Sequence, residues 1–188
     1  MVNVPNTLSL LRLLLVPVLL ALAWNGQGEI FLNLLVVSLL TDALDGWLAR
    51  KLNQTSDLGA RLDSWADLLT SLSLPLAGWW LRPDVMRAEG AFLLTGVGIY
   101  LATILYGWLK FRKLTSYHTW AAKSAAVIVA VAVIAFFAGG PGWPLRVAMP
   151  VVIAACLEEI CITIIMKSWR ANIPTLWHAM QLQRRTNP

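Results

Sequence analysis

Charged residues and cysteines are scarce in this chain of 188 residues. Only 13% of the residues are charged and 58% are hydrophobic, whereas a soluble globular domain carries about 25% charged residues. This composition excludes an ordinary soluble domain. The two cysteines, Cys156 and Cys161, lie five residues apart in one apolar run and so fall on different faces of a helix. That spacing excludes a disulfide between them and offers no cysteine metal site.

A concentrated basic patch is also missing, although Lys and Arg together number 15 against 10 for Asp and Glu. The basic residues flank apolar runs instead, as they do in proteins that are oriented in a membrane. Nucleic acid is therefore not an expected partner, whereas membrane lipid is.

Six apolar segments are long enough, or nearly so, to cross about 30 Å of hydrocarbon as helices. We expect these helices at Leu8–Trp24, Ile30–Leu48, Ala60–Leu81, Ala91–Leu109, Trp120–Ala138 and Leu145–Met166. The connections between them are short and rich in turn-forming residues. The sequence predicts an all-α integral membrane protein with six transmembrane helices in one domain over residues 1–168. A short polar cytoplasmic tail is expected over residues 169–188.

The loop charges predict the orientation of these helices. The second and fourth connections, and the segment after the sixth helix, carry several Lys and Arg residues each. The first, third and fifth connections hold only Arg82, Arg87 and Arg146. By the positive-inside rule, both termini and the even-numbered connections face the cytoplasm. We therefore expect a multi-pass protein of the cell's inner (cytoplasmic) membrane.

Four aspartates lie in stretches that otherwise read as membrane-buried helix: Asp42, Asp45, Asp63 and Asp67. A carboxylate at bilayer depth costs roughly 3 kcal/mol on insertion scales, so each needs a partner or a function. The first two are three residues apart and the last two are four apart, and both spacings place a pair on one helical face. Little basic charge is expected nearby, so divalent cations are the simplest partners. Two helices with two carboxylates each can hold two cations, an arrangement that serves phosphoryl transfer.

The residues around the aspartates suit a phosphate ligand. Gly46 and Gly59 are small and allow close approach within a bilayer. Arg50 and Lys51 can offer charge to a phosphate, Arg with bidentate geometry. One alternative is a carboxylate network that only neutralises the local basic residues. The positive-inside argument places the whole cluster at the cytoplasmic ends of the second and third helices.

The stretch from Asp42 to Asp67 reads Asp-x2-Asp-Gly-x2-Ala-Arg-x8-Gly-x3-Asp-x3-Asp. It matches, without a gap or a mismatch, the signature of the CDP-alcohol phosphatidyltransferase family, which the chain resembles over nearly its whole length. The opening from Val4 to Arg12 resembles the Pro-Asn-x-Leu-Thr-x-x-Arg opening of the family's phosphatidylglycerolphosphate synthases, with Ser9 in place of Thr.

The resemblance implies an enzyme that transfers a phosphatidyl group from CDP-diacylglycerol to an alcohol and releases CMP. It implies that two Mg²⁺ ions, or Mn²⁺, are held by Asp42, Asp45, Asp63 and Asp67. Asp67 would also be the catalytic base on the acceptor hydroxyl. The family's contacts to the CDP-alcohol correspond to Pro5, Asn6, Thr7, Leu8, Gly46, Arg50 and Ser56.

The acceptor is expected to be glycerol 3-phosphate, because Lys123 resembles the Gly-Lys position of the synthases that use it. A phosphorylated acceptor needs cations, and Arg61 and Arg112 are further candidates. Arg112 also fits the simpler role of a positive-inside flank. Leu68 stands where many glycerol-phosphate members have Lys, and inositol phosphate, serine and phosphatidylglycerol stay open as acceptors.

Other classes of protein place their acids differently. A divalent-cation transporter would set them along a path near the bilayer midplane, and a prenyltransferase would need two separated acidic motifs. A homodimer is expected by analogy with relatives of this fold. Glu158 and Glu159, inside the sixth helix, are expected to pair with neighbouring helices or to line the acceptor pocket.

Overall fold

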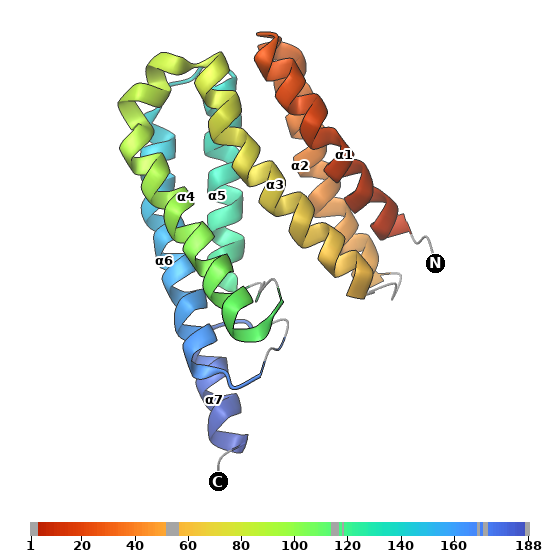
Figure 1. Cartoon of the computed structure of the whole chain (residues 1–188), viewed down its shortest axis with the longest axis vertical. Helices are drawn as coiled ribbons and strands as arrows, with labels where there is room; N and C mark the ends of the chain where they lie inside the picture. Colours follow the sequence, from red (N-terminus) through yellow and green to blue (C-terminus); the bar gives the residue numbers. More distant parts are fainter. Residues whose placement is uncertain are drawn as a thin grey trace. The chain divides into compact units, whose positions relative to one another are not determined.

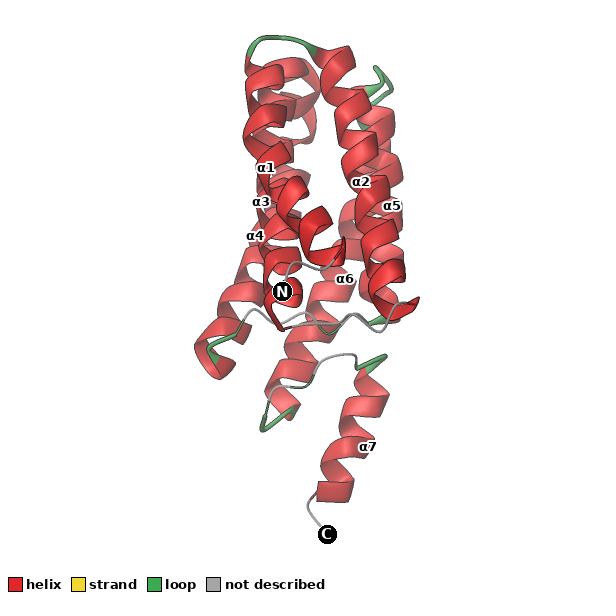
Figure 2. Ribbon diagram, turned by 90° about the vertical axis from the view of Figure 1, so that its right-hand side faces the viewer, coloured by secondary structure: helices red, strands yellow, loops and turns green. Residues whose placement is uncertain are grey.

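The computed structural model describes residues 4–51, 57–113, 117, 119–168, 170 and 173–186. Within these ranges the chain forms helices joined by turns and loops, and no strand (Figure 1, Figure 2). The helices are α1 Val4–Trp24, α2 Gly28–Lys51, α3 Asp57–Leu81, α4 Pro83–Phe111, α5 Trp120–Phe137, α6 Trp143–Ile165 and α7 Leu176–Thr186. The all-α prediction is confirmed, and α1 to α6 fall on the six expected segments. The helix α7 was not expected.

Four of the described helices are long and apolar enough to cross a membrane. They are Asn6–Trp24, Pro83–Phe111, Trp120–Phe137 and Trp143–Ile165, with mean hydropathies between 1.7 and 2.1. The two helices that carry the aspartates, α2 and α3, are not among the spans found in the described residues. The six-span count therefore stays a prediction.

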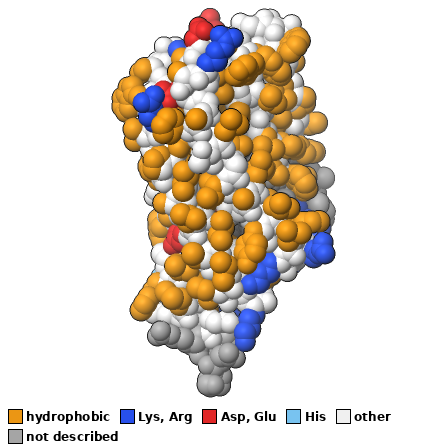
Figure 3. All heavy atoms as spheres, turned by 60° about the vertical axis from the view of Figure 1, so that its left-hand side comes forward, with side chains coloured by type: hydrophobic (Ala, Val, Ile, Leu, Met, Phe, Trp, Pro, Cys, Tyr) orange, Lys and Arg blue, Asp and Glu red, His pale blue; other side chains and the backbone are white. Residues whose placement is uncertain are grey.

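Large apolar side chains cover much of the protein surface. Leu94 is 74% exposed, Val127 65% and Val131 64%. Figure 3 shows hydrophobic side chains spread over the visible face, with Lys and Arg side chains gathered toward its two ends. A water-soluble monomer rarely exposes so much contiguous apolar surface, and lipid tails are the medium that would cover it.

The chain divides into two compact units, Met1–Ala88 with Ile134–Gly140 and Glu89–Val133 with Pro141–Pro188. In the first unit, α1 packs along both α2 and α3 (Figure 1). The turn between α1 and α2 passes through Gly26, whose φ of +70° is readily adopted only by glycine. At the far end of α1, Trp24 meets Trp80 of α3 edge to face, with ring centroids 5.1 Å apart.

A second set of contacts closes the first unit around residues 134–140. The Arg82 guanidinium donates to the carbonyl oxygens of Phe136, at 2.6 Å, and Gly140, at 3.1 Å. Gly78 allows α3 and α4 to approach closely, since a Cβ atom there would lie 2.8 Å from Met86 Sδ. The Arg82 side chain thus supplies hydrogen-bond donors to carbonyl oxygens at and just beyond the end of α5.

In the second unit, α4 and α6 run parallel. Near their starts, Arg146 on α6 donates Nε and Nη2 to the two carboxylate oxygens of the buried Glu89 on α4, at 2.9 and 2.8 Å. At their other ends, Lys110 Nζ donates to the carbonyl oxygen of Thr163 at 2.8 Å. These two contacts hold the helices in register from end to end.

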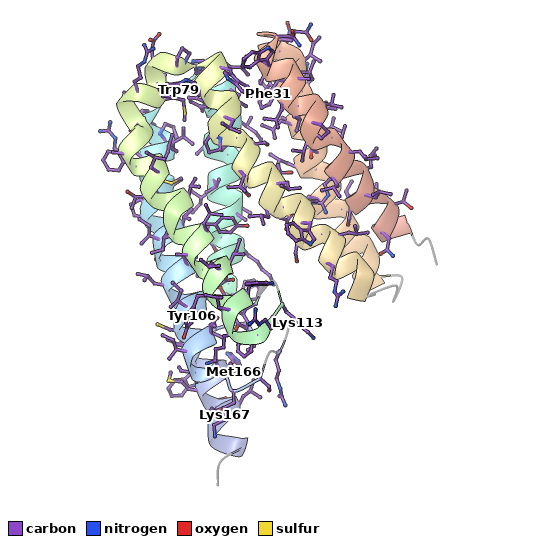
Figure 4. All side chains as sticks on the ribbon, in the orientation of Figure 1. Phe31, Trp79, Tyr106, Lys113, Met166 and Lys167 are labelled. Carbon is purple, nitrogen blue, oxygen red and sulfur yellow. The ribbon has the colours of Figure 1, made fainter. Side chains whose placement is uncertain are left out.

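The helix α7 packs against α6 through a buried apolar cluster. The members of this cluster are Tyr117, Ile162, Met166, Ile173 and Ala179 (Figure 4 labels Met166). Two backbone bonds join the segment before α7 to the one before α5: Ile173 N–H to Tyr117 O at 3.1 Å and Trp120 N–H to Pro174 O at 3.0 Å. The expected polar tail thus contains a docked helix.

Candidate metal centre

Three of the four predicted aspartates converge in the first unit. Asp42 comes from α2, and Asp63 and Asp67 come from α3. Each offers a carboxylate oxygen, and the three oxygens lie within 4.8 Å of one another. The spacing of four residues places the α3 pair on one helical face, and the packing of α1 against both α2 and α3 brings that face beside Asp42. The structure brings these three residues together, and their role as metal ligands stays a prediction.

A buried arginine from α1 lies among the carboxylates. The side chain of Arg12 is 4% exposed; its Nη1 contacts Asp42 Oδ1 and donates to Asp67 Oδ1 at 3.0 Å. Its Nη2 donates to Asp63 Oδ1 at 2.5 Å. The expectation that little basic charge lies nearby is therefore wrong, because a residue 30 positions before Asp42 and 55 before Asp67 is folded onto the cluster.

Sequence reasoning placed Arg12 in the opening motif but assigned it no role. The signal was present: an arginine inside an apolar stretch has to be paired, as an intramembrane charge does. Asn6, Ser9 and Arg12 follow one another at intervals of three and are all at least 93% buried. They form a polar stripe on α1, in a helix whose other residues are mostly apolar.

The remaining residues expected to bind the CDP-alcohol are described only in part. Thr7 is exposed and Leu8 is half-buried, both in the first turns of α1. The side chains of Pro5, Asp45, Gly46 and Arg50, and the whole of Ser56, lie outside the described residues. Their roles stay predictions.

The three residues expected at the acceptor occupy both units. Arg61 is exposed on α3, in the first unit. Lys123 is exposed in the first turn of α5, in the second unit, with its Nζ 5.0 Å from the centroid of the Trp120 ring. Arg112 follows α4 with φ of 56°, and its guanidinium lies 5.2 Å from the Trp108 ring. Their roles at an acceptor stay predictions.

The two glutamates of α6 have acquired separate structural roles. Glu158 Oε1 accepts a hydrogen bond of 3.0 Å from the N–H of Leu176, at the start of α7. Glu159 accepts a hydrogen bond from the backbone N–H of Tyr117. Both carboxylates therefore hold loop or helix-end backbone in the second unit.

The carboxylate cluster fits a divalent cation. Three acidic oxygens from two helices are hard ligands of the kind that Mg²⁺ and Mn²⁺ prefer. The cluster already attracts one cation of the chain itself, because the Arg12 guanidinium donates hydrogen bonds to Asp63 and Asp67. Such a site can neutralise phosphate charge and support transfer at phosphorus.

Comparison with known proteins gives a family. Residues 2–176 match the model of the CDP-alcohol phosphatidyltransferase family. A Mycobacterium tuberculosis protein named probable phosphatidylglycerophosphate synthase is 31% identical over 175 residues, which cover 86% of this chain and 78% of that protein.

Two further relatives match over shorter stretches. A Mycobacterium tuberculosis protein named putative cardiolipin synthase is 38% identical over 120 residues, 55% of this chain and 56% of that protein. An Aquifex aeolicus protein named CDP-diacylglycerol--glycerol-3-phosphate 3-phosphatidyltransferase is 37% identical over 99 residues, 53% of this chain and 56% of that protein. The chain thus spans little more than half the length of these two relatives.

The match to the family model and the apolar helices lead to the same conclusion. The matched region begins before α1, contains the whole carboxylate cluster and ends at the first residue of α7. The four apolar helices are those of an integral membrane protein. The chain belongs to the CDP-alcohol phosphatidyltransferase family.

Proposed function

We propose that this protein transfers a phosphatidyl group from CDP-diacylglycerol to glycerol 3-phosphate and releases CMP, in phospholipid biosynthesis. The observation that carries the proposal is the convergence of Asp42, Asp63 and Asp67 on one site in a chain of this family. The active site faces the cytoplasm of the inner membrane in this proposal, where a soluble nucleotide and an embedded lipid meet. By the same family analogy, the protein works as a homodimer.

The chemistry needs a base and a leaving group. The acceptor hydroxyl gives its proton to Asp67, and its oxygen forms a bond to the phosphorus that bears diacylglycerol. The bond from that phosphorus to the bridging oxygen breaks, and the electron pair leaves with CMP. Asp42, Asp45, Asp63 and Asp67 would hold two Mg²⁺ ions, or Mn²⁺, which would neutralise the diphosphate.

The choice of glycerol 3-phosphate has two supports. The first is the names of two relatives. The Aquifex aeolicus protein is named CDP-diacylglycerol--glycerol-3-phosphate 3-phosphatidyltransferase, and the Mycobacterium tuberculosis protein that matches over 175 residues is named probable phosphatidylglycerophosphate synthase. Lys123 supplies an exposed cation in the first turn of α5, suited to the phosphate of the acceptor.

A second acceptor is favoured by a different observation. The relative named putative cardiolipin synthase is 38% identical over 120 residues. Phosphatidylglycerol would then be the acceptor, and the same carboxylates would perform the same transfer. The phosphate of the acceptor belongs to a lipid when the acceptor is phosphatidylglycerol, and to a soluble molecule when the acceptor is glycerol 3-phosphate.

The test is CMP release by the purified full chain with CDP-diacylglycerol and Mg²⁺, with one acceptor at a time. Glycerol 3-phosphate, phosphatidylglycerol, serine and inositol phosphate form the panel, and Asp63→Asn is the inactive control. Release with glycerol 3-phosphate alone is the expected result. Release with phosphatidylglycerol alone would replace the acceptor. Cation flux across vesicles without any CMP release would favour a transporter instead.

A further inference from the structure

The guanidinium of Arg12 and a divalent cation would share the same three partners. Arg12 contacts one oxygen on each of Asp42, Asp63 and Asp67. These are the residues whose carboxylate oxygens come close enough together to hold a metal ion. Because the Arg12 side chain is 4% exposed, water does little to screen its charge from anything that binds beside it.

Formal charge limits what this cluster can hold at once. Counted at formal charge, three aspartates and one guanidinium sum to minus two, and Asp45 would bring the sum to minus three. Two divalent cations would turn the site net positive in the presence of Arg12. With all four aspartates counted, removing the guanidinium from the carboxylates would bring the formal charge to zero, and like charges this close together in a partly buried site repel one another.

We propose that Arg12 is the resident counter-ion of the carboxylate cluster and competes with divalent cations for it. Binding of cations requires Arg12 to give up carboxylate contacts, so this residue sets the cation affinity of the site. The inference rests on the proposed function in one respect, that the aspartates bind a divalent cation. Arg12 is a positioning residue in this account, and no step of the transfer is assigned to it.

The same contacts explain how the first unit can be assembled without a metal ion. Arg12 joins α1 to α2 through Asp42, and α1 to α3 through Asp63 and Asp67. Without a cation of some kind, the aspartates would repel one another and push α2 and α3 apart. A permanently attached guanidinium supplies that cation during folding, at the cost of a weaker metal site.

The test measures Mn²⁺ affinity of the purified full chain in detergent, from the electron paramagnetic resonance signal of free Mn²⁺. The unfolding temperature is recorded with and without Mn²⁺. We expect Arg12→Gln to bind Mn²⁺ at least about fivefold more tightly than the wild type, the lower end of ordinary coupling between two ligands. Its unfolding temperature should fall without the metal and rise more than that of the wild type when Mn²⁺ is added.

Two other variants separate competition from simple loss of an ion pair. Arg12→Lys keeps the charge but loses the planar fork, so its Mn²⁺ affinity should lie between those of the wild type and Arg12→Gln. If Arg12→Gln does not fold, the Lys variant decides the matter. Arg146→Gln breaks the ion pair with Glu89 in the second unit, and it should lower the unfolding temperature without changing Mn²⁺ affinity.

The outcomes distinguish this inference from the proposed function. Unchanged or weaker Mn²⁺ binding in the folded Arg12 variants would overturn the competition, while the metal site itself would stand. Equal Mn²⁺ binding by the wild type and Asp63→Asn would instead mean that the aspartates hold no cation. That result would contradict the proposed function, and with it the cation binding on which the competition depends.

Discussion

The carboxylate of Glu158, on α6, accepts a hydrogen bond of 3.0 Å from the backbone N–H of Leu176, the first residue of α7. The first N–H groups of a helix lack intrahelical partners, and the positive end of the helix dipole favours an acid there. The start of α7 is therefore fixed by a side chain 18 residues earlier in the sequence.

Glu158→Ala should loosen α7. Loss of a capping acceptor costs about 1 kcal/mol of helix stability, so the amides of Leu176 and its neighbours should exchange with solvent several times faster. Hydrogen exchange followed by mass spectrometry checks this. Glu158→Gln retains an acceptor oxygen and should lose less protection. Exchange in the Ala variant as slow as in the wild type would show that the carboxylate does not cap the helix.

Tyr117→Phe should destabilise the second unit by about 1 kcal/mol, the usual net value of a buried hydrogen bond. The Thr163 hydroxyl donates its only proton to Glu159 O at 2.8 Å, so Tyr117 must be the donor in the 3.0 Å contact with Thr163 Oγ1. Burial raises the pKa of Tyr117, which keeps the phenol protonated and able to donate at neutral pH. Denaturant unfolding measures the change, and Tyr106→Phe, on a more exposed tyrosine, is the matched control.

Asp67→Asn should abolish CMP release while the protein stays folded. The amide cannot take the proton of the acceptor hydroxyl, whereas its size and shape are those of the acid. Asp84→Asn, on a carboxylate with a side chain 94% exposed, is the matched control and should keep full activity. Transfer by the Asp67 variant at a rate near that of the wild type would rule out this residue as the base.

Lys123→Gln should raise the KM for glycerol 3-phosphate and leave the KM for CDP-diacylglycerol nearly unchanged. A charge-assisted contact to phosphate contributes about 1.5 to 3 kcal/mol, so a rise of tenfold or more is expected. Lys167→Gln, which removes an exposed lysine that follows α6, serves as the control. If both variants raise the KM equally, the effect comes from general surface charge.

Removal of divalent cations should stop CMP release, and Mg²⁺ should restore it. Carboxylate sites on helices bind such ions reversibly, so chelation by EDTA empties them without unfolding a chain that has Arg12 as counter-ion. Activity assays before and after dialysis, with circular dichroism in parallel, measure both effects. Full activity in excess EDTA would contradict the proposed metal centre.

The helices could be predicted because their apolar runs are long and because glycine, asparagine or proline stands at the breaks after α1, α3 and α5. The fifth segment was expected at Trp120–Ala138 and forms Trp120–Phe137. The aspartate site was also predictable, since its i, i+4 spacing on α3 is a local property. The helix α7 was missed because an 11-residue helix is marginal alone and depends on docking of residues such as Ala179.

Arg12 was missed for another physical reason. Its partners are 30 to 55 residues away, and only the packing of α1 against α2 and α3 brings them together. Local patterns reveal which side chains need a partner, whereas the choice of partner is decided by tertiary contacts. Glu158 illustrates the same point, because its partner is a backbone N–H and not the basic residue of a neighbouring helix.

The docking of α7 has a practical consequence for anyone who purifies this protein. A deletion after residue 168 would uncover Ile162 and Met166, which are now 0% and 4% exposed. It would also remove the Leu176 N–H, from which the Glu158 carboxylate accepts a hydrogen bond. Shortened versions should therefore aggregate in detergent more readily than the full chain. An affinity tag is better joined after Pro188 through a flexible spacer, where it does not disturb the packing of α7 against α6.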